Sequence, residues 1–142
     1  MGTTGCVFCA ILGGSIPSHK VRETARSLAF LDIHPLSWGH TLVVPKVHAA
    51  ELPEVSPEDW ADMTEVARWV ALRLRTVLEV EGNNLFVASG TAAEQSVRHL
   101  HIHVVPRRQA DDLAFNDWWV SKLQPTNPDE LAKTAAVLRA KG

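Results

Sequence analysis

Three histidines alternate with aliphatic residues late in the chain: His99, His101 and His103 are separated by Leu100 and Ile102. In a β-strand, successive side chains point to opposite faces, so the three imidazoles would line one face roughly 7 Å apart. An ordinary half-buried strand gains little from three titratable rings that repel one another when protonated. The pattern favours nucleophilic and acid–base chemistry, with metal binding as the alternative. Because one strand spreads three rings too widely for a single metal ion, we expect them to divide these roles.

A small polar loop, Gly90–Ser96, precedes the histidines. Such a loop can present backbone N–H groups and the hydroxyl of Ser96 to a phosphate. The same composition is common in ordinary hairpins, so the adjacent histidines are what make an anion site the favoured interpretation.

The segment QSVRHLHIHVVPR, residues 95–107, resembles the signature of the histidine triad (HIT) family of nucleotide hydrolases and transferases. Residues 30–35 (FLDIHP) and 39–48 (GHTLVVPKVH) resemble the N-terminal half of that family. Residues 6–11 (CVFCAI), followed by Ile16-Pro17, resemble the start of its bacterial and archaeal members. A histidine at the third position of the triad is similar to the hydrolase branches of the family. The resemblance therefore covers about residues 6–107, most of the chain.

The resemblance implies a catalytic role for five residues. His101 is expected to attack the α-phosphorus of a nucleotide and form a nucleotidyl-histidine intermediate. His103 would hydrogen-bond the phosphoryl oxygens or the leaving group, and His40 would join that network. Ser96 and Gln95 would contact the phosphate and the leaving-group side.

The resemblance also implies a nucleotide-binding site. Asp32 is expected to accept hydrogen bonds from both ribose hydroxyls, and Ala88 stands where many members carry Asn or Gln directed at the phosphate. Glu94 replaces the usual glycine, and its carboxylate would repel an anionic substrate unless it points away. Seven apolar residues are expected to form a slot for the base, although each is equally compatible with an ordinary core. They are Phe8, Ile11, Ile16, Phe30, Leu31, Ile33 and Leu42.

A Cys-x-x-Cys pair, Cys6 and Cys9, has a spacing common in zinc sites. A tetrahedral site needs two more ligands, and we expect His48, which follows a strand ending at Pro45, and His99. A structural zinc held by these four residues would pin the N-terminus to the catalytic strand. The alternatives are a reduced, metal-free cysteine pair and, less favoured, a redox motif.

Several elements must position these residues. Ser56 and Pro57 mark the start of a long amphipathic helix, which Gly82 ends. The alternation of strands with one long helix predicts an α+β fold. The resemblance implies an antiparallel five-stranded sheet with short terminal helices, in a single HIT domain over residues 1–142 whose C-terminal tail, residues 108–142, matches no family feature. Residues 6–13 are expected to form a short helix or a turn. Expected helices are 57–80 and 128–140, and expected strands are 19–23, 27–33, 40–45, 84–89 and 98–105.

Composition restricts the function further. With 142 residues, 46% of them hydrophobic, the chain is long enough for one real core, and its 14 basic and 16 acidic residues give a net charge of −2. This near-neutral charge gives no electrostatic drive toward nucleic acid or a membrane surface. Neither a spanning segment nor a signal peptide is recognisable, so the cytoplasm is the expected location.

The expected function is hydrolysis at the α-phosphate of nucleoside phosphoramidates, dinucleoside polyphosphates or related adenylates, releasing a nucleoside monophosphate such as AMP from a purine nucleotide. The alternative is a catalytically weak nucleotide-binding or interaction module. The resemblance implies a homodimer in which two sheets join and the long helix lies at the interface. Trp60 and Trp69 fall on or near the apolar stripe of that helix, and Trp118 and Trp119 are expected to anchor the core or, less favoured, to reach the partner.

Overall fold

The computed structural model describes residues 4–140, and the chain divides into two compact units between Asp111 and Asp112. The first unit contains one five-stranded sheet, in the order β1-β2-β3-β5-β4, in which all neighbouring strands are antiparallel. The α+β fold and the five-stranded antiparallel sheet are therefore confirmed. The strands are β1 (Lys20–Glu23), β2 (Ser27–Leu31), β3 (Thr41–Pro45), β4 (Gly82–Val87) and β5 (Ile102–Arg107).

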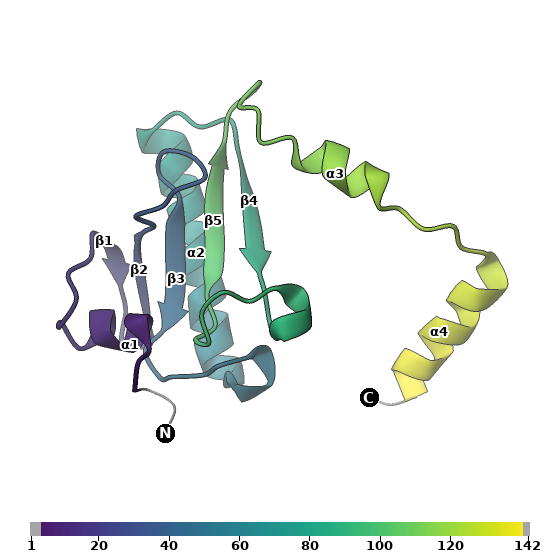
Figure 1. Ribbon diagram of the computed structural model, residues 1–142, viewed down its shortest axis with the longest axis horizontal. Coiled ribbons are helices and arrows are strands. Elements are labelled where there is room, and N and C mark those ends of the chain that lie inside the picture. The colour runs from purple at the N-terminus through teal and green to yellow at the C-terminus, as the bar shows by residue number, and fades with distance from the viewer. Residues whose placement is uncertain (1–3, 141–142) are drawn as a thin grey trace. The chain divides into compact units, whose positions relative to one another are not determined.

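The long helix α2 (Pro57–Val77) runs along one face of the sheet (Figure 1). It begins as predicted, because the Oγ of Ser56 accepts a hydrogen bond from the N–H of Asp59. It ends earlier than the predicted residue 80. Glu79 adopts a left-handed conformation with φ of +54°, which stops the helix, and Gly82 begins β4 instead.

Apolar side chains cover both faces of the sheet. On one face, Ala29 and Val43 pack with Met63 and Val70 of α2. On the other, Phe8 from the short helix α1 (Val7–Leu12) packs with a second set of strand residues. The strictly alternating orientation of strand side chains explains why neighbouring residues enter different clusters. The second set consists of Leu28, Phe30, Leu42 and Val44.

The histidine segment differs from the predicted strand 98–105, because β5 begins only at Ile102. The backbone N–H of Leu100 donates to the carbonyl of Ala49, in the loop after β3, and not to the β3 ladder. Only His103 is therefore a strand residue, paired opposite Leu42. The three imidazoles do not form the single row that a regular strand would impose.

The second unit contains two helices, α3 (Phe115–Ser121) and α4 (Pro128–Ala140), the latter as predicted. None of its described residues is buried. Within this unit, Trp118 and Trp119 remain 63% and 64% exposed. That they anchor the core, or reach the partner, stays a prediction. That the whole chain forms one domain stays a prediction. Among the helices of residues 4–140, none is long and apolar enough to cross a membrane.

Gly39, directly before His40, adopts a φ of +101° in a tightly packed turn. A Cβ there would lie 2.9 Å from Leu74 Cδ2 and 3.0 Å from Leu78 Cδ1. We expect Gly39→Ala to lower the free energy of unfolding by about 2–4 kcal/mol, combining backbone strain with overpacking. Urea denaturation measures this loss. The matched control is Gly14→Ala, whose φ is +83° but whose Cβ would meet nothing within 4 Å. Equal losses in the two variants would contradict the steric argument.

Candidate active site

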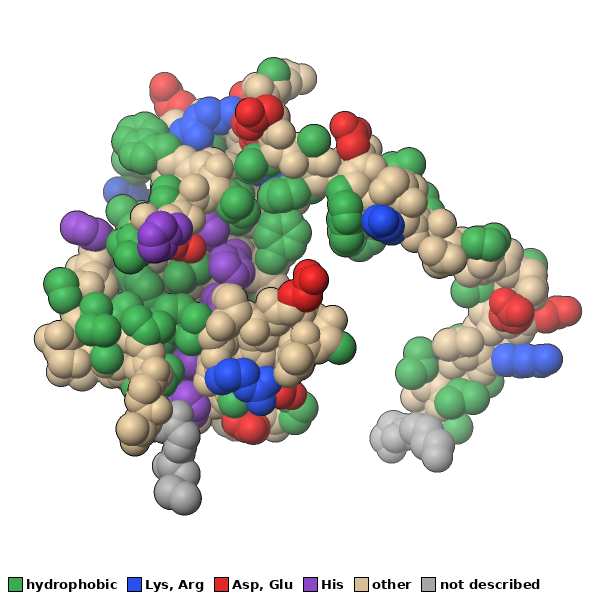
Figure 2. Space-filling model, in the orientation of Figure 1, with side chains coloured by type: hydrophobic (Ala, Val, Ile, Leu, Met, Phe, Trp, Pro, Cys, Tyr) green, Lys and Arg blue, Asp and Glu red, His purple; other side chains and the backbone are tan. Residues whose placement is uncertain are grey.

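A cavity of about 460 Å³ opens on the face of the sheet that carries α1. Figure 2 shows histidine side chains on this face, bordered by hydrophobic ones. Asp32, His101 and His103 line the cavity together with all seven apolar residues expected to hold the base, which are Phe8, Ile11, Ile16, Phe30, Leu31, Ile33 and Leu42. Three of these seven also belong to the hydrophobic cluster beneath α1, so for them the core and pocket interpretations both hold.

The tautomer of His101 follows from one backbone contact. Its Nδ1 lies 2.9 Å from the carbonyl oxygen of His99. A carbonyl can only accept, so Nδ1 carries the proton and donates it. Burial lowers the pKa of His101, an effect that the His99 carbonyl and the Asp32 carboxylate partly offset. His101 is therefore a neutral ring of the cavity wall with a lone pair on Nε2, as a nucleophile requires.

A hydrogen-bond relay leads to His103. The backbone N–H of Leu36 donates to Nδ1 of His40 over 3.1 Å, which leaves the proton of His40 on Nε2. Nε2 of His40 lies 3.0 Å from Nδ1 of His103 and donates to it. His103 must then carry its own proton on Nε2. Burial, followed by neighbouring His101 and His40, lowers the pKa of His103 to about 4. His103 is thus a neutral hydrogen-bond donor in the cavity wall.

Asp32 lies at the same end of the cavity. One carboxylate oxygen accepts the backbone N–H of His34 at 2.8 Å, and the other lies 3.8 Å from Nε2 of His40. Asp32, His40 and His103 thus bring ligand atoms within 4.8 Å of one another. The relay argues against a metal ion there, because Nε2 of His40 holds its proton as long as Leu36 donates to the opposite nitrogen. We assign this cluster to hydrogen bonding.

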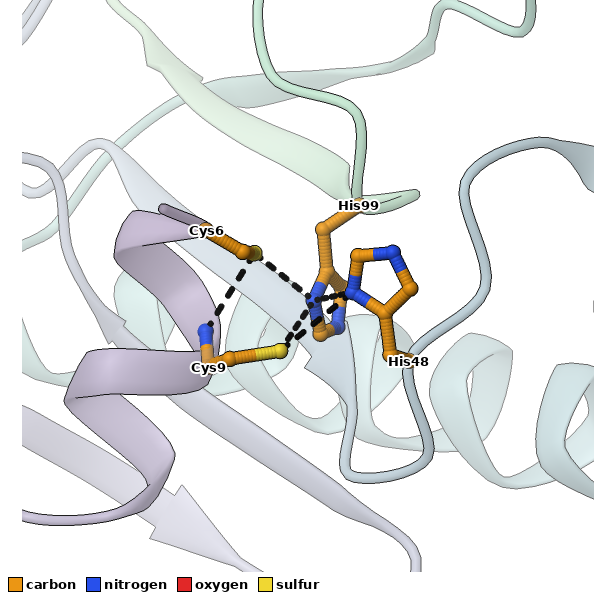
Figure 3. Close-up of side chains that lie close together, drawn as sticks. All are labelled: Cys6, Cys9, His48 and His99. Carbon is orange, nitrogen blue, oxygen red and sulfur yellow. Dashed lines mark hydrogen bonds between the residues drawn. The ribbon is translucent and has the colours of Figure 1, made fainter. Parts of the chain in front are cut away.

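The structure brings the four predicted metal ligands together (Figure 3). His99 turns away from the cavity and donates from Nε2 to the carbonyl of Pro45 at 2.8 Å, which leaves its Nδ1 free to bind a metal. Nδ1 of His99 lies 3.4 Å from Sγ of Cys6 and 3.6 Å from Sγ of Cys9. Nδ1 of His48 lies 3.3 Å from Sγ of Cys9 and 3.2 Å from Nδ1 of His99.

These distances fit a tetrahedral zinc site. Zn–S bonds of about 2.3 Å and Zn–N bonds of about 2.0–2.1 Å give a tetrahedron with S···N edges of about 3.5 Å and N···N edges of about 3.4 Å. Burial and then the neighbouring Cys6 raise the pKa of the Cys9 thiol. A cation between the four groups would relieve this penalty, because it favours the thiolate. Two thiolates and two neutral imidazoles match the donor set of structural zinc sites.

Two neighbouring side chains of the loop before the triad, Gln95 and Ser96, lie in different surroundings. Ser96 lines the cavity, as expected of a phosphate-contacting hydroxyl. The side chain of Gln95 instead accepts the N–H of Gly90 and donates to the carbonyls of Ala50 and Val97. Because the amide of Gln95 already makes these three hydrogen bonds to the backbone, it is not placed for the predicted contact with the substrate. These hydrogen bonds of Gln95 fix the backbone of the loop on both sides of Ser96.

The two departures from the family pattern lie outside the cavity lining. Ala88 follows β4 and does not line the cavity, so the expected role at the phosphate is not seen for it. Glu94 has a φ of +60° and ψ of +35°, the left-handed conformation in which glycine is favoured. Its exposed side chain is not part of the cavity wall, which reduces the expected repulsion of an anionic substrate.

Several cavity residues were not predicted from the sequence. Ser18, His34 and Val97 line the cavity, as do Val7 and Pro17. The turn at residues 32–34 had a usable signal, since Asp commonly accepts the N–H two residues later. The N–H of Leu36 had none, because a backbone donor can stand at any residue type.

The HIT domain family model matches residues 13–110. An adenosine 5'-monophosphoramidase of Schizosaccharomyces pombe is 39% identical over 126 residues, covering 89% of this chain and 90% of that protein. A zinc-bound histidine triad family protein from Mycobacterium smegmatis is 44% identical, with a TM-score of 0.76 over 80% of this chain and 83% of the other. A HIT family member from Bacillus subtilis has a TM-score of 0.84 at 32% identity, covering 97% of both chains. With the family model covering well over half of its length, the chain belongs to the HIT family.

Proposed function

We propose that this protein is a nucleotide hydrolase that acts at the α-phosphate through a nucleotidyl-histidine intermediate on His101. The observation that carries the proposal is the fixed tautomer of His101, whose Nδ1 donates to the carbonyl of His99 within the wall of the cavity. A neutral imidazole held in this way needs no reorganisation before it attacks phosphorus.

The reaction proceeds in two displacements. Nε2 of His101 forms a bond to the α-phosphorus, and the bond from phosphorus to the leaving group breaks, with the electron pair departing on the leaving group. Nε2–H of His103 donates to the phosphoryl oxygens or the leaving group as charge develops there. The leaving group takes up a proton as it departs. Water then attacks phosphorus and gives up a proton to solvent, the P–N bond breaks with its electron pair returning to Nε2, and a nucleoside monophosphate leaves with His101 restored as a neutral ring.

The rest of the cavity suits the nucleoside. The carboxylate of Asp32 accepts the ribose hydroxyls, while the apolar wall around Phe8 and Phe30 takes a purine base. A volume of about 460 Å³ is in the range of small-molecule sites. Nucleoside phosphoramidates, dinucleoside polyphosphates and related adenylates are the substrate classes, and the name of the fission-yeast relative favours the first.

A catalytically weak nucleotide-binding module is the second candidate. Ala88 and the internally bonded Gln95 leave few side-chain donors for the leaving-group side of the phosphate. Incubation with adenosine phosphoramidate and with a dinucleoside polyphosphate separates the candidates. We expect AMP to be released from at least the phosphoramidate. Nucleotide binding without AMP release in the whole panel would favour the binding module.

Zinc is proposed as a structural ion held by Cys6, Cys9, His48 and His99. When bound, it supplies a fixed tetrahedral junction among three segments that are distant in sequence. Cys6 and Cys9 would hold α1 in place. The side chain of His99 would be a ligand, and the backbone carbonyl of the same residue orients His101. The ion thus supports the catalytic geometry, while His101 and His103 stay free for the substrate.

A homodimer is proposed as the assembled form. β4 is an edge strand, with Leu85, Phe86 and Val87 each at least 40% exposed. Edge strands of this kind readily pair with another chain. Pairing of two copies there would join the sheets, with α2 beside the junction. A monomeric mass by light scattering at micromolar concentration would contradict it.

A further inference from the structure

A second cavity, of about 380 Å³, lies between the sheet and the C-terminal half of α2. Six aliphatic side chains and two indole rings, Trp38 and Trp69, line it, and the sheet residues among them come from β1, β2 and β3. Only Leu31 also lines the nucleotide cavity. This second cavity is therefore a separate, strongly apolar space, in the size range of small-molecule sites.

Two arginines give the cavity a charged rim. The guanidinium of Arg22 lies 4.4 Å from the ring centroid of Trp69, and that of Arg73, which lines the cavity, lies 5.7 Å from it. Within residues 4–140, no carboxylate lies within ion-pair distance of either arginine. The other polar lining residue, Thr41, uses its hydroxyl to donate to the carbonyl of Gly39. Positive charge at this rim is thus not balanced by the described protein groups.

We propose that this cavity binds a small aromatic carboxylate. An apolar ring system would replace water against the aliphatic wall and the two indoles, while its carboxylate would pair with Arg73 and the nearby Arg22. Among the described lining residues there is no carboxylate for ribose hydroxyls, and the one hydroxyl, that of Thr41, already donates to the carbonyl of Gly39. The chemistry of the lining therefore selects a compact amphipathic anion and not a second nucleotide.

The position of the cavity keeps it apart from the proposed dimer contact. Its sheet residues belong to β1, β2 and β3, and Val21 of β1 marks the edge opposite β4. The β4 side of α2 is identified by Asn83, whose side chain donates to the carbonyl of Ala71. A second copy joined at β4 would thus leave the cavity open.

Calorimetric titration of the full-length, zinc-loaded protein with 2-naphthoate tests the proposal. We expect one molecule to bind per chain, with the same affinity in the presence of saturating AMP. The neutral analogue 2-naphthamide should bind about tenfold more weakly, as should 2-naphthoate to Arg73→Gln. Arg75→Gln, an exposed arginine of the same helix outside the lining, should bind like wild type.

A filling variant gives a readout that does not depend on charge. Val77 is 56% exposed and lines the cavity, so a Trp side chain in Val77→Trp can enter it and should abolish binding. Thr76→Trp, at the neighbouring exposed residue outside the lining, is the control and should retain it. Three results would each overturn the proposal: no saturable binding to wild type, competition between 2-naphthoate and AMP, or wild-type affinity for 2-naphthoate in both Arg73→Gln and Val77→Trp.

Discussion

Replacing His101 with Ala should reduce turnover of a nucleoside phosphoramidate by at least about 10⁴-fold, the scale of losing a nucleophile. The neighbouring ring of His103 cannot take its place, because its Nδ1 already accepts from His40. Affinity for AMP should change little, since the ribose carboxylate and the apolar wall are untouched. Steady-state kinetics and calorimetric binding of AMP measure the two quantities.

Two controls separate chemistry from folding. His101 is only 3% exposed, so the Ala variant creates a void, and His101→Gln retains most of the side-chain volume with no comparable nucleophile. His34→Ala removes an exposed histidine from the same cavity wall and should stay within a few-fold of wild type. Single-turnover labelling from an α-phosphate-labelled substrate should trap the label on His101. Near wild-type turnover in both His101 variants, or label on another residue, would refute the mechanism.

The sequence was informative where chemistry depends on side-chain type. Cys6 and Cys9 at metal spacing, with His48 and His99, were predicted as one cluster, and the structure brings these four together. The α+β fold was predicted from the distinct hydrophobic periodicities of the strands and the long helix, while the five-stranded antiparallel sheet was implied by the family resemblance. Side-chain identity and period are local properties, so they can be read without knowing the fold.

Features set by the backbone were harder to predict. The end of α2 depends on the left-handed turn at Glu79, a residue type that seldom adopts it. The role of Gln95 depends on three backbone partners brought near by folding, whereas the family resemblance implied a substrate contact. Within the second unit, Trp118 and Trp119 of α3 are not buried, although both are large and apolar.

Removal of the zinc ligands should have the largest effect on stability. We expect the double variant Cys6→Ala/Cys9→Ala to lower the free energy of unfolding by more than about 4 kcal/mol, the scale typical of losing a metal site. The six-residue helix α1 is too short to be stable by itself. Without the junction, Phe8 should leave its packing against Phe30 and His101, whose ring centroids lie 5.6 and 5.1 Å away.

The effect of zinc loss should extend to catalysis through His99. Its imidazole is a proposed ligand, and its carbonyl accepts the Nδ1–H that fixes the tautomer of His101, so a mobile His99 loosens the nucleophile. Loss of support of this kind typically costs about 10–100-fold in activity. A strong chelator should lower the unfolding midpoint and turnover of wild type toward the values of the double variant, and should leave that variant unchanged. Metal analysis should find one zinc per wild-type chain and none in the variant. If wild type holds well under one zinc per chain, or if chelation affects both proteins equally, the ion has no structural role here, and the four side chains are held by their own hydrogen bonds.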